Sequence, residues 1–296
     1  MALALSLPRF HEPSAYPDKV SLASIVIPAY NEGRVISRCL QALKDSGLDV
    51  EIVVAANGCT DDTAARAAAF PGVTVLEIPT PGKSGALNEG DAAAHAFPRI
   101  FLDADIVLGP GALAGMIDAL TTDAPVVAAP AVKFCTGGAP WTVRQYYEIY
   151  SRTPYVVNGL IGLGVYGMSR AARARFEQFP SLTADDLFVQ RLFDEGERIT
   201  TPGWFEVKTP RNLADLVQVR TRVARGNTEL AQNAAALPPG DFETTTGSTV
   251  KAIGRMVAAN PRLAPAALLY IAVVAGGRLR AHRTAPGTWN RDESTR

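Results

Sequence analysis

Short apolar runs alternate with segments of helical periodicity along the first half of the chain. One such segment, residues 33–47, repeats apolar side chains every three or four positions and stops at Gly47. Uniformly apolar strands that alternate with amphipathic helices indicate βαβ units, hence an α/β fold with a Rossmann-like, mostly parallel sheet flanked by helices. The expected strands are 24–30, 51–56, 73–78, 99–105 and 124–132, and the intervening helices are 33–47, about 60–69, 84–96 and one opened by Pro110.

The pattern loosens after about residue 141, where the expected elements are mixed. Residues 162–169 predict either a Gly-rich turn or a short strand, and residues 198–209 predict a short β segment. A loop rich in Pro, Gly and Thr covers 237–248 and precedes two C-terminal helices. The other helices are expected at 141–150, 183–196 and 212–230.

Composition and charge narrow the functional classes. The 296 residues are 47% hydrophobic and carry 29 basic and 29 acidic side chains, so no global charge favours nucleic acid as a partner. The three cysteines form no CxxC pair, which argues against a disulfide framework or a zinc site. The first ten residues lack a basic region and an adequate apolar core, so we expect no secretory signal and a cytoplasmic location.

The C-terminal region contains the longest nearly uncharged apolar run, residues 263–277. As a helix this run rises ~22 Å, less than the ~30 Å hydrocarbon layer, so we do not expect it to span a membrane. Two alternatives remain: a packed or homo-oligomer-forming helix, or peripheral contact with an anionic inner membrane leaflet. The second follows from the flanking basic residues Lys251, Arg255, Arg262, Arg278, Arg280 and Arg283.

Polar side chains follow each of the first four expected strands. In a parallel sheet these positions meet at the carboxyl edge, where ligands bind. Independent surface loops would not need carboxylate, amide and ammonium groups at four successive strand ends. The residues are Tyr30, Asn31 and Glu32 after the first strand, Asn57 after the second, Lys83 after the third, and Asp103 with Asp105 after the fourth.

The motif Asp103-Ala104-Asp105 offers two carboxylates at one strand end. In an extended chain both point to the same side, and the small Ala104 lets a donor ligand approach the backbone. Carboxylates, water and phosphate oxygens are the usual ligands of Mg²⁺ or Mn²⁺. The alternative is an ordinary strand end with a helix cap, so the motif alone is weak.

A second acidic pair, Asp185 and Asp186, begins an expected helix in the second half. The pair could merely favour the positive end of the helix dipole. An ionised carboxylate there also suits a general base that removes a proton from an acceptor hydroxyl. The three histidines lie in a tail, an Ala-rich helix and the basic C-terminus, so a histidine mechanism is not expected.

The expected helix 212–230 places Arg220, Arg222 and Arg225 within two turns. One alternative is a solvated helix face or a nucleic-acid patch. The other is a guanidinium grip on a diphosphate, which would complement a metal held by the aspartates.

The sequence resembles the family 2 glycosyltransferases of GT-A fold over roughly residues 22–230. The conjunction of ordered blocks is specific, whereas any single block is not. The resemblance implies inverting transfer of one sugar from a nucleotide-diphosphate donor, a divalent metal and an aspartate base. The blocks are SIVIPAYNEGRVISRCLQAL, IVVAANGCTDDTAARAA, GKSGALNEG, IFLDADIVLGPGAL and TADDLFVQRL.

The resemblance also implies roles for individual residues. Asp186 matches the family's base, Asp185 its acidic neighbour and Asp105 its metal ligand, while Asp103 would serve both the ribose and the metal. Lys83 would lie near the nucleobase or the phosphates of the donor. The segment 222–226, with Arg222 and Arg225, would close over the diphosphate. The nucleoside pocket would be lined by Pro28, Ala29, Tyr30, Asn31, Glu32 and Asn57.

Two departures from the family pattern matter. Paired aspartates commonly follow the second strand in the family, whereas this chain has Ala56 and Asn57, which leaves the donor base undetermined. Processive members carry a QxxRW signature, but Val219 and Val223 occupy the glutamine and tryptophan positions. A non-processive enzyme is therefore expected.

The resemblance divides the chain into a lead (1–21), a nucleotide-sugar-binding half (22–135), an acceptor and catalytic-base half (136–236), and a linker with C-terminal helices (237–296). The acceptor is a glycan, a lipid-linked molecule or a small molecule, and Trp204 is the candidate contact because aromatic faces suit sugar rings. The alternative functions are a nucleotidyltransferase and a non-catalytic nucleotide-sugar-binding protein.

Overall fold

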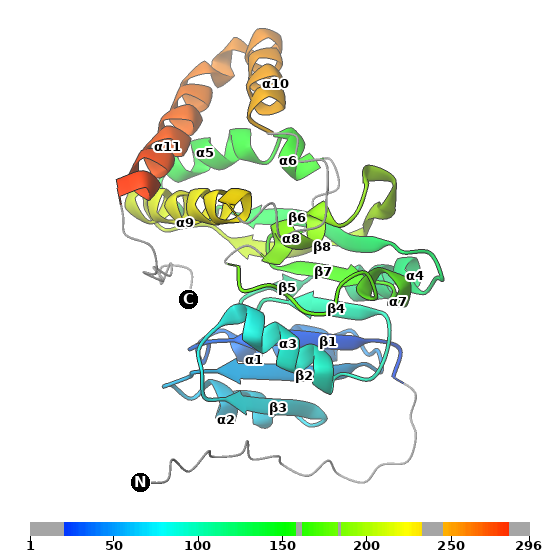
Figure 1. Cartoon of the computed structure of the whole chain (residues 1–296). Helices are drawn as coiled ribbons and strands as arrows, with labels where there is room; N and C mark the ends of the chain where they lie inside the picture. The colour runs from blue at the N-terminus through cyan, green and yellow to red at the C-terminus, as the bar shows by residue number, and fades with distance from the viewer. Residues whose placement is uncertain (1–20, 158–161, 183–184, 233–244, 284–296) are drawn as a thin grey trace.

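The computed structural model describes residues 21–157, 162–182, 185–232 and 245–283. Its centre is one eight-stranded sheet with the order β3-β2-β1-β4-β7-β6-β8-β5 (Figure 1). The strands are β1 Ser24–Ala29, β2 Glu51–Asn57, β3 Val73–Ile78, β4 Arg99–Leu102, β5 Val107–Leu108, β6 Val127–Cys135, β7 Val165–Met168 and β8 Arg198–Lys208.

Most of the sheet is parallel, as expected. β1 pairs with β2 and β4, and β2 with β3, all in parallel register, and every residue of β1 is buried. Two strands run the opposite way: β7 is antiparallel to both β4 and β6, and β5 is antiparallel to β8. The segment 162–169 is therefore a strand over Val165–Met168, inserted in the middle of the sheet.

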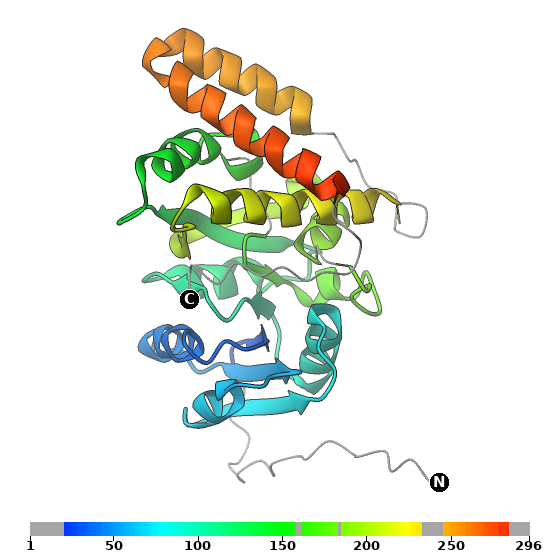
Figure 2. The same ribbon diagram turned by 90° about the vertical axis from the view of Figure 1, so that its left-hand side faces the viewer.

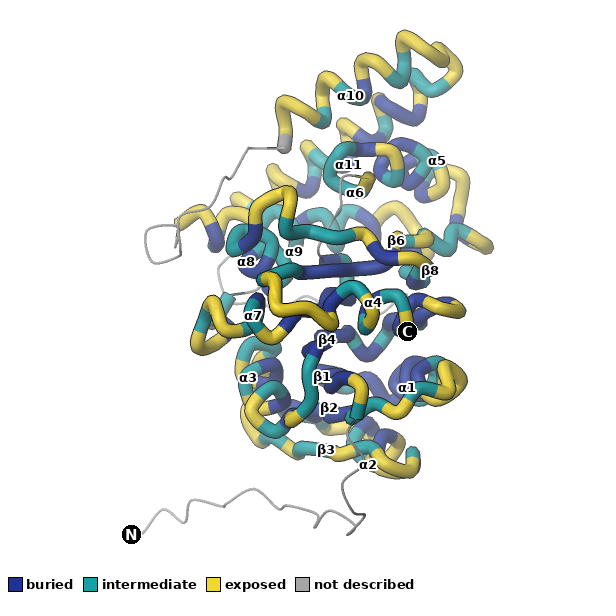
Figure 3. Tube along the Cα trace, turned by 90° about the vertical axis from the view of Figure 1, so that its right-hand side faces the viewer, coloured by how far each residue is buried: buried dark blue, intermediate teal, exposed yellow. Residues whose placement is uncertain are grey.

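Helices cover both faces of the sheet (Figure 3). One core packs β1 and β2 against α1, α2 and α4, and the opposite core packs the same strands against α3, α7 and α8. β1 and all but the first residue of β2 are therefore buried, because neither face of these two strands meets solvent. These helices are α1 Ile36–Asp45, α2 Thr63–Ala68, α3 Lys83–Ala93, α4 Ala112–Leu120, α7 Arg170–Arg173 and α8 Asp185–Arg191.

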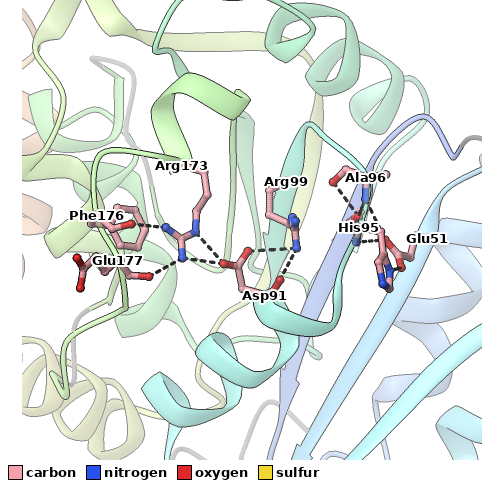
Figure 4. A network of polar contacts seen from close by, with 9 residues as sticks. Glu51, Asp91, His95, Ala96, Arg99, Arg173, Phe176 and Glu177 are labelled. Atoms are coloured by element: carbon pink, nitrogen blue, oxygen red, sulfur yellow. Dashed lines mark hydrogen bonds and ion pairs between the residues drawn. The ribbon is translucent and has the colours of Figure 1, made fainter.

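An ion-pair network fixes α3 in place (Figure 4). Asp91 on α3 lies 3.2 Å from Arg99 of β4 and 2.7 Å from Arg173 of α7, measured between its carboxylate oxygens and their guanidinium nitrogens. All three side chains are largely buried, so these contacts are weakly screened. The start of α3, which carries Lys83, is thereby held at a defined position relative to β4.

A third core lies among helices beyond β6 and β8 (Figures 1 and 2). α11 packs against α9 and α5 and buries Tyr270, Val273 and Gly277. The helices in this part are α5 Trp141–Tyr150, α6 Pro154–Val157, α9 Leu213–Gln232, α10 Thr245–Ala259 and α11 Ala264–Arg283, with short 3₁₀ turns at Glu195–Glu197 and Pro261–Leu263.

The last helix is longer than the apolar run that predicted it. The helical stretch Pro261–Arg283 has 23 residues, and by length and composition it could cross a membrane. The expectation that it is too short rested on residues 263–277 alone, so that argument was wrong. Its buried side nevertheless packs on α5 and α9, because small and aromatic residues of α11 fit between them.

Candidate active site

A cavity of about 880 Å³ lies at the carboxyl ends of β1, β2 and β4. Its walls come from the strand ends, from the start of α8 and from α5 and α9. The structure therefore brings together residues from both halves of the chain. Of the residues singled out in the sequence, the cavity is lined by Pro28, Tyr30, Asn31, Glu32, Asn57, Lys83, Asp103, Ala104, Asp105, Asp185, Asp186, Arg220 and Arg222.

Lys83 lies between two of the predicted carboxylates. Its Nζ is 2.8 Å from Asp103 Oδ1 and 2.9 Å from Asp185 Oδ1. Loss of hydration lowers the pKa of Lys83, but the two carboxylates outweigh it and raise the pKa above its ordinary value. Lys83 therefore remains an ammonium ion that joins the strand-end motif to the start of α8.

Asp185 bridges Lys83 and Tyr166. Its side chain is only 6% exposed, and its second oxygen accepts a hydrogen bond of 3.1 Å from the Tyr166 hydroxyl. Both carboxylate oxygens are thus occupied, one by an ammonium group and one by a phenol. Such a buried carboxylate is well satisfied, because each of its oxygens already has a polar partner.

Asp186 has the properties of a general base. One carboxylate oxygen, Oδ1, accepts the backbone N–H of Leu187 at 2.8 Å, and the side chain lines the cavity. Loss of hydration, and next the neighbouring Asp185 carboxylate, raise the pKa of Asp186 to about 6. At Gly162, whose φ of +141° favours glycine, a Cβ atom would lie 2.8 Å from Asp186 Oδ2, so this close approach also requires glycine.

The Asp103-Ala104-Asp105 motif differs from the extended geometry expected for it. β4 ends at Leu102, and the chain turns at once, with Ile106 N–H donating to Asp103 O at 3.1 Å. Asp103 N–H donates to Gly164 O at 2.7 Å, beyond the β4–β7 ladder. The strand is shorter because this turn takes the place of further pairing. Both carboxylates still line the cavity.

Two carboxylates at the end of β4, those of Asp103 and Asp105, could hold a divalent cation. The described residues contain no group of three or more His, Cys, Asp or Glu side chains that could hold a metal alone. Mg²⁺ and Mn²⁺ do not require one, because substrate phosphates and water commonly complete their coordination. Asp105 and the Asp103 oxygen not paired with Lys83 are hard donors that fit such an ion.

Asn57 connects the loops that follow three strands. Its Nδ2 donates to Ala29 O at 2.9 Å, and its Oδ1 accepts the Gly82 N–H at 2.9 Å. An aspartate could not make the first of these bonds, because an ionised carboxylate has no hydrogen to donate. The amide therefore has a structural reason to stand after β2. Ala29 contributes this carbonyl and does not itself line the cavity.

Two predicted contacts lie outside the cavity. Arg225 is not among its lining residues, whereas Arg220 and Arg222 are. The Trp204 ring packs on Lys133, whose Nζ is 4.3 Å from the ring centroid, and its carbonyl accepts the Gly109 N–H at 2.8 Å. These contacts turn Trp204 to another part of the sheet, so the structure does not support it as an acceptor contact.

Several cavity residues were not singled out individually, although the region 134–181 was expected to shape the acceptor pocket. Tyr166 and a group of tyrosines on α5 and α6 line the cavity, together with Pro81 and Gly82. The available signal was the sequence WTVRQYYEIY, in which Tyr146 and Tyr150 share one helix face. The same pattern is equally typical of a face that packs on another helix, and Tyr146 does pack on Tyr270 of α11.

Comparisons with known proteins agree with this geometry. The model of the family described as glycosyl transferase family 2 matches residues 24–177, just over half of the chain. The chain is 36% identical over 105 residues to the succinoglycan biosynthesis protein ExoO of Rhizobium meliloti (strain 1021), covering 34% of this chain and 30% of that protein. It is 33% identical over 115 residues to the chondroitin synthase of Escherichia coli, covering 37% and 17%. The alignments thus span less than a third of these two relatives.

The structure is also similar to that of the mannosyltransferase PcManGT from Pyrobaculum calidifontis, solved in complex with GDP-Man and Mn²⁺. The TM-score is 0.65 at 17% identity, over 90% of this chain and 88% of that one, which shows a common fold. The expected GT-A type fold is confirmed. Because the family model covers more than half of the sequence, the chain belongs to glycosyl transferase family 2 and is a glycosyltransferase.

Proposed function

We propose that the protein transfers one sugar, with inversion, from a nucleotide-diphosphate donor to an acceptor hydroxyl, and that Asp186 is the general base. One observation carries the proposal: a carboxylate with a raised pKa shares a single cavity with Asp103, Asp105 and cationic side chains. A base and a set of diphosphate-binding groups are the two requirements of such a transfer. Family membership supports the same reaction class.

The donor diphosphate would bind between the strand ends and α9. Asp105 and Asp103 would hold Mg²⁺ or Mn²⁺, and Arg222 would contact the diphosphate from α9. When bound, the metal supplies positive charge to the departing diphosphate. The PcManGT structure, which contains Mn²⁺ with a sugar nucleotide, supports this choice of ion. Lys83 contributes by fixing Asp103 and Asp185 in their relative positions.

The chemical step is a single displacement. Asp186 removes the proton of the acceptor hydroxyl, and the hydroxyl oxygen attacks the anomeric carbon from the face opposite the diphosphate. The bond between that carbon and the diphosphate oxygen breaks, and the nucleoside diphosphate leaves with the bonding electrons. Inversion at the anomeric carbon follows. The valines at 219 and 223, in place of a QxxRW signature, favour one addition per cycle.

Product analysis tests this function against the two alternatives. With a nucleotide-sugar and Mn²⁺ the protein should release nucleoside diphosphate and transfer the sugar. A nucleotidyltransferase would instead release pyrophosphate from a nucleoside triphosphate, and a non-catalytic binding protein would leave the donor intact. Release of pyrophosphate, or no turnover of any donor that binds, would contradict the proposal.

The exposed side of α11 supports a peripheral membrane location. Leu268, Ile271 and Leu279 are 69%, 50% and 60% exposed, and Pro265, Ala272 and Ala275 complete the same apolar stripe. Residues 245–283 contain six Lys and Arg and no Asp or Glu, so this surface complements anionic lipid. A second copy of the same surface would meet like charge. We therefore place an anionic bilayer, on the cytoplasmic side, against α11.

A further inference from the structure

The wall of the cavity formed by α5, α6 and α9 differs from the donor side. We call it the tyrosine chamber and define it by Phe134, Tyr146, Tyr147, Tyr150, Tyr155 and Arg220, all of which line the cavity. Its aromatic rings pack closely, with Tyr146 and Tyr150 stacked at 5.6 Å between ring centroids. The proposed mechanism gives no role to any of these residues.

Arg220 is the charge in this chamber. Its guanidinium lies 5.5 Å from the centre of the Tyr150 ring, and its stem packs against Gly277 of α11, where a Cβ atom would approach to 2.9 Å. Among the described residues no carboxylate forms an ion pair with Arg220, and its buried Nε has no hydrogen-bond partner. A guanidinium held this way lacks a counter-charge.

The tyrosines do not supply that counter-charge. Burial raises the pKa of Tyr146 well above its ordinary value and raises that of Tyr150 as well, so both phenols are neutral at physiological pH. Tyr146 Oη is also buried without a hydrogen-bond partner in the described structure. Two unsatisfied atoms, the Nε of the Arg220 guanidinium and the Oη of the Tyr146 phenol, therefore line the same wall. Burying a lone cation is unfavourable unless an anion joins it.

The chamber adjoins the proposed base. Burial raises the pKa of Tyr155, and the Asp186 carboxylate raises it further, which places Tyr155 within electrostatic range of the base. Lys83 lines the same cavity and lowers the pKa of Asp186, so Asp186 has a cationic neighbour other than Arg220. An acceptor could therefore present a hydroxyl to Asp186 while another of its groups lies at Arg220.

We propose that the tyrosine chamber is the acceptor subsite and that the acceptor carries an oxyanion, a phosphate or a carboxylate, bound by Arg220. This inference rests on the proposed function for the identity of the ligand as acceptor. The planar guanidinium suits two oxygens of one anion, and a neighbouring phenol can donate to a remaining lone pair of the same anion. The aromatic rings favour an acceptor with apolar surface next to the anionic group.

Calorimetry with small probes tests the subsite on the full chain. Phenyl phosphate and benzoate supply the two anions on an apolar ring, and benzyl alcohol is the neutral control. Each is titrated with and without a saturating nucleoside diphosphate and Mn²⁺, so that the donor site is filled in one arm. We expect an anionic probe to bind in both arms, and the tighter anion identifies the acceptor group.

Arg220→Gln should weaken that binding about 10- to 100-fold, as expected for a lost charge-assisted hydrogen bond, and leave the nucleoside diphosphate affinity unchanged. Arg225→Gln removes the same charge from the same helix outside the cavity and should change neither. If Arg220→Gln does not fold, two other variants test the subsite. Arg220→Lys keeps the charge but loses the paired N–H donors of the guanidinium, so it should bind the anionic probe with intermediate affinity. Tyr146→Phe should weaken binding of the probe by a smaller factor.

Three results would overturn the subsite: equal binding by the wild type and the Arg220 variants, equal binding of benzyl alcohol, or competition between the anionic probe and the nucleoside diphosphate. Failure of the proposed function gives a different result. In that case no nucleoside diphosphate would bind, while the anionic probe would still depend on Arg220.

Discussion

Lys83 at the start of α3 and Asp185 at the start of α8 form an ion pair of 2.9 Å, although the two residues lie in different halves of the chain. Removing one partner leaves a buried charge unmatched. We expect Lys83→Met to lower the free energy of unfolding by about 3 kcal/mol and to reduce activity, because Asp185 is 6% exposed. Urea denaturation measures the stability change.

The double variant Lys83→Met/Asp185→Asn provides the control for this prediction. It should be less destabilised than the sum of the two single variants, because the unmatched carboxylate is gone. Strict additivity of the two stability changes would show that the pair has no energetic coupling. It would contradict the proposal that Lys83 positions Asp185.

The substitution Asp186→Asn should lower the activity but raise the free energy of unfolding at neutral pH. The folded-state pKa of Asp186, about 6, lies above the ordinary value of 3.8, so the folded protein binds more protons between these values. Its contribution therefore becomes destabilising as pH rises from about 4 to 6 and stays so above 6. Asp186→Asn should be more stable than the wild type at pH 7.5, by about 1–3 kcal/mol, and equal to it near pH 3.5.

The same titration governs the wild-type rate. The base acts only when ionised, so kcat/KM, which reports the free enzyme, should rise with pH through about 6 and then level off. Thermal unfolding of both proteins across this range, with the wild-type rate profile, checks the prediction. If Asp186→Asn were less stable than the wild type at pH 7.5, the fold would not raise the pKa of Asp186, and this prediction would be wrong.

Asp105→Ala should abolish the metal-dependent part of donor binding. For the wild type, Mn²⁺ should enlarge the increase in Tm produced by a nucleoside diphosphate, since a ligand at 100 times its Kd stabilises the folded state by about 2.7 kcal/mol. Asp118→Ala, which removes an exposed acid on α4 outside the cavity, should behave as the wild type. An undiminished effect of Mn²⁺ in Asp105→Ala would remove Asp105 from the metal site.

Binding of α11 to membranes can be measured by co-sedimentation with vesicles. The wild type should bind vesicles with anionic lipid more strongly than zwitterionic ones, and salt should weaken the binding. Changing Leu268, Ile271 and Leu279 together to Gln should lower partitioning more than about tenfold, because three exposed apolar side chains are lost. The control Leu22→Gln/Leu213→Gln alters exposed apolar residues elsewhere. Equal partitioning of the triple variant and the wild type would exclude this surface.

Much of the donor side could be predicted from sequence because it follows from local pattern. Apolar strands that alternate with helices place their carboxyl ends at one sheet edge, so Tyr30, Asn57, Lys83 and Asp105 were expected together, and they line one cavity. The acidic pair at the start of α8 lies at the same cavity. The position of this acidic pair in the sequence follows from the TADDLF block.

The remainder depends on contacts between distant segments. β7 is short and interrupted by Gly167, so its place between β4 and β6 follows from pairing partners rather than from its own pattern. The bonds of Lys83 with Asp185 and of Tyr166 with Asp185 likewise join separate elements. Trp204 illustrates the converse: an aromatic residue in a turn suggested a sugar contact, but Lys133 and Gly109 hold it elsewhere.

The most direct test of the central claim compares sugar transfer by the wild type and Asp186→Asn, using the nucleotide-sugar that raises Tm most in the presence of Mn²⁺. We predict that the wild type releases nucleoside diphosphate and forms a product of inverted anomeric configuration. Asp186→Asn should bind the donor with unchanged affinity and transfer the sugar about 10²- to 10⁴-fold more slowly. A near-normal kcat in Asp186→Asn, or a product of retained configuration, would contradict the mechanism.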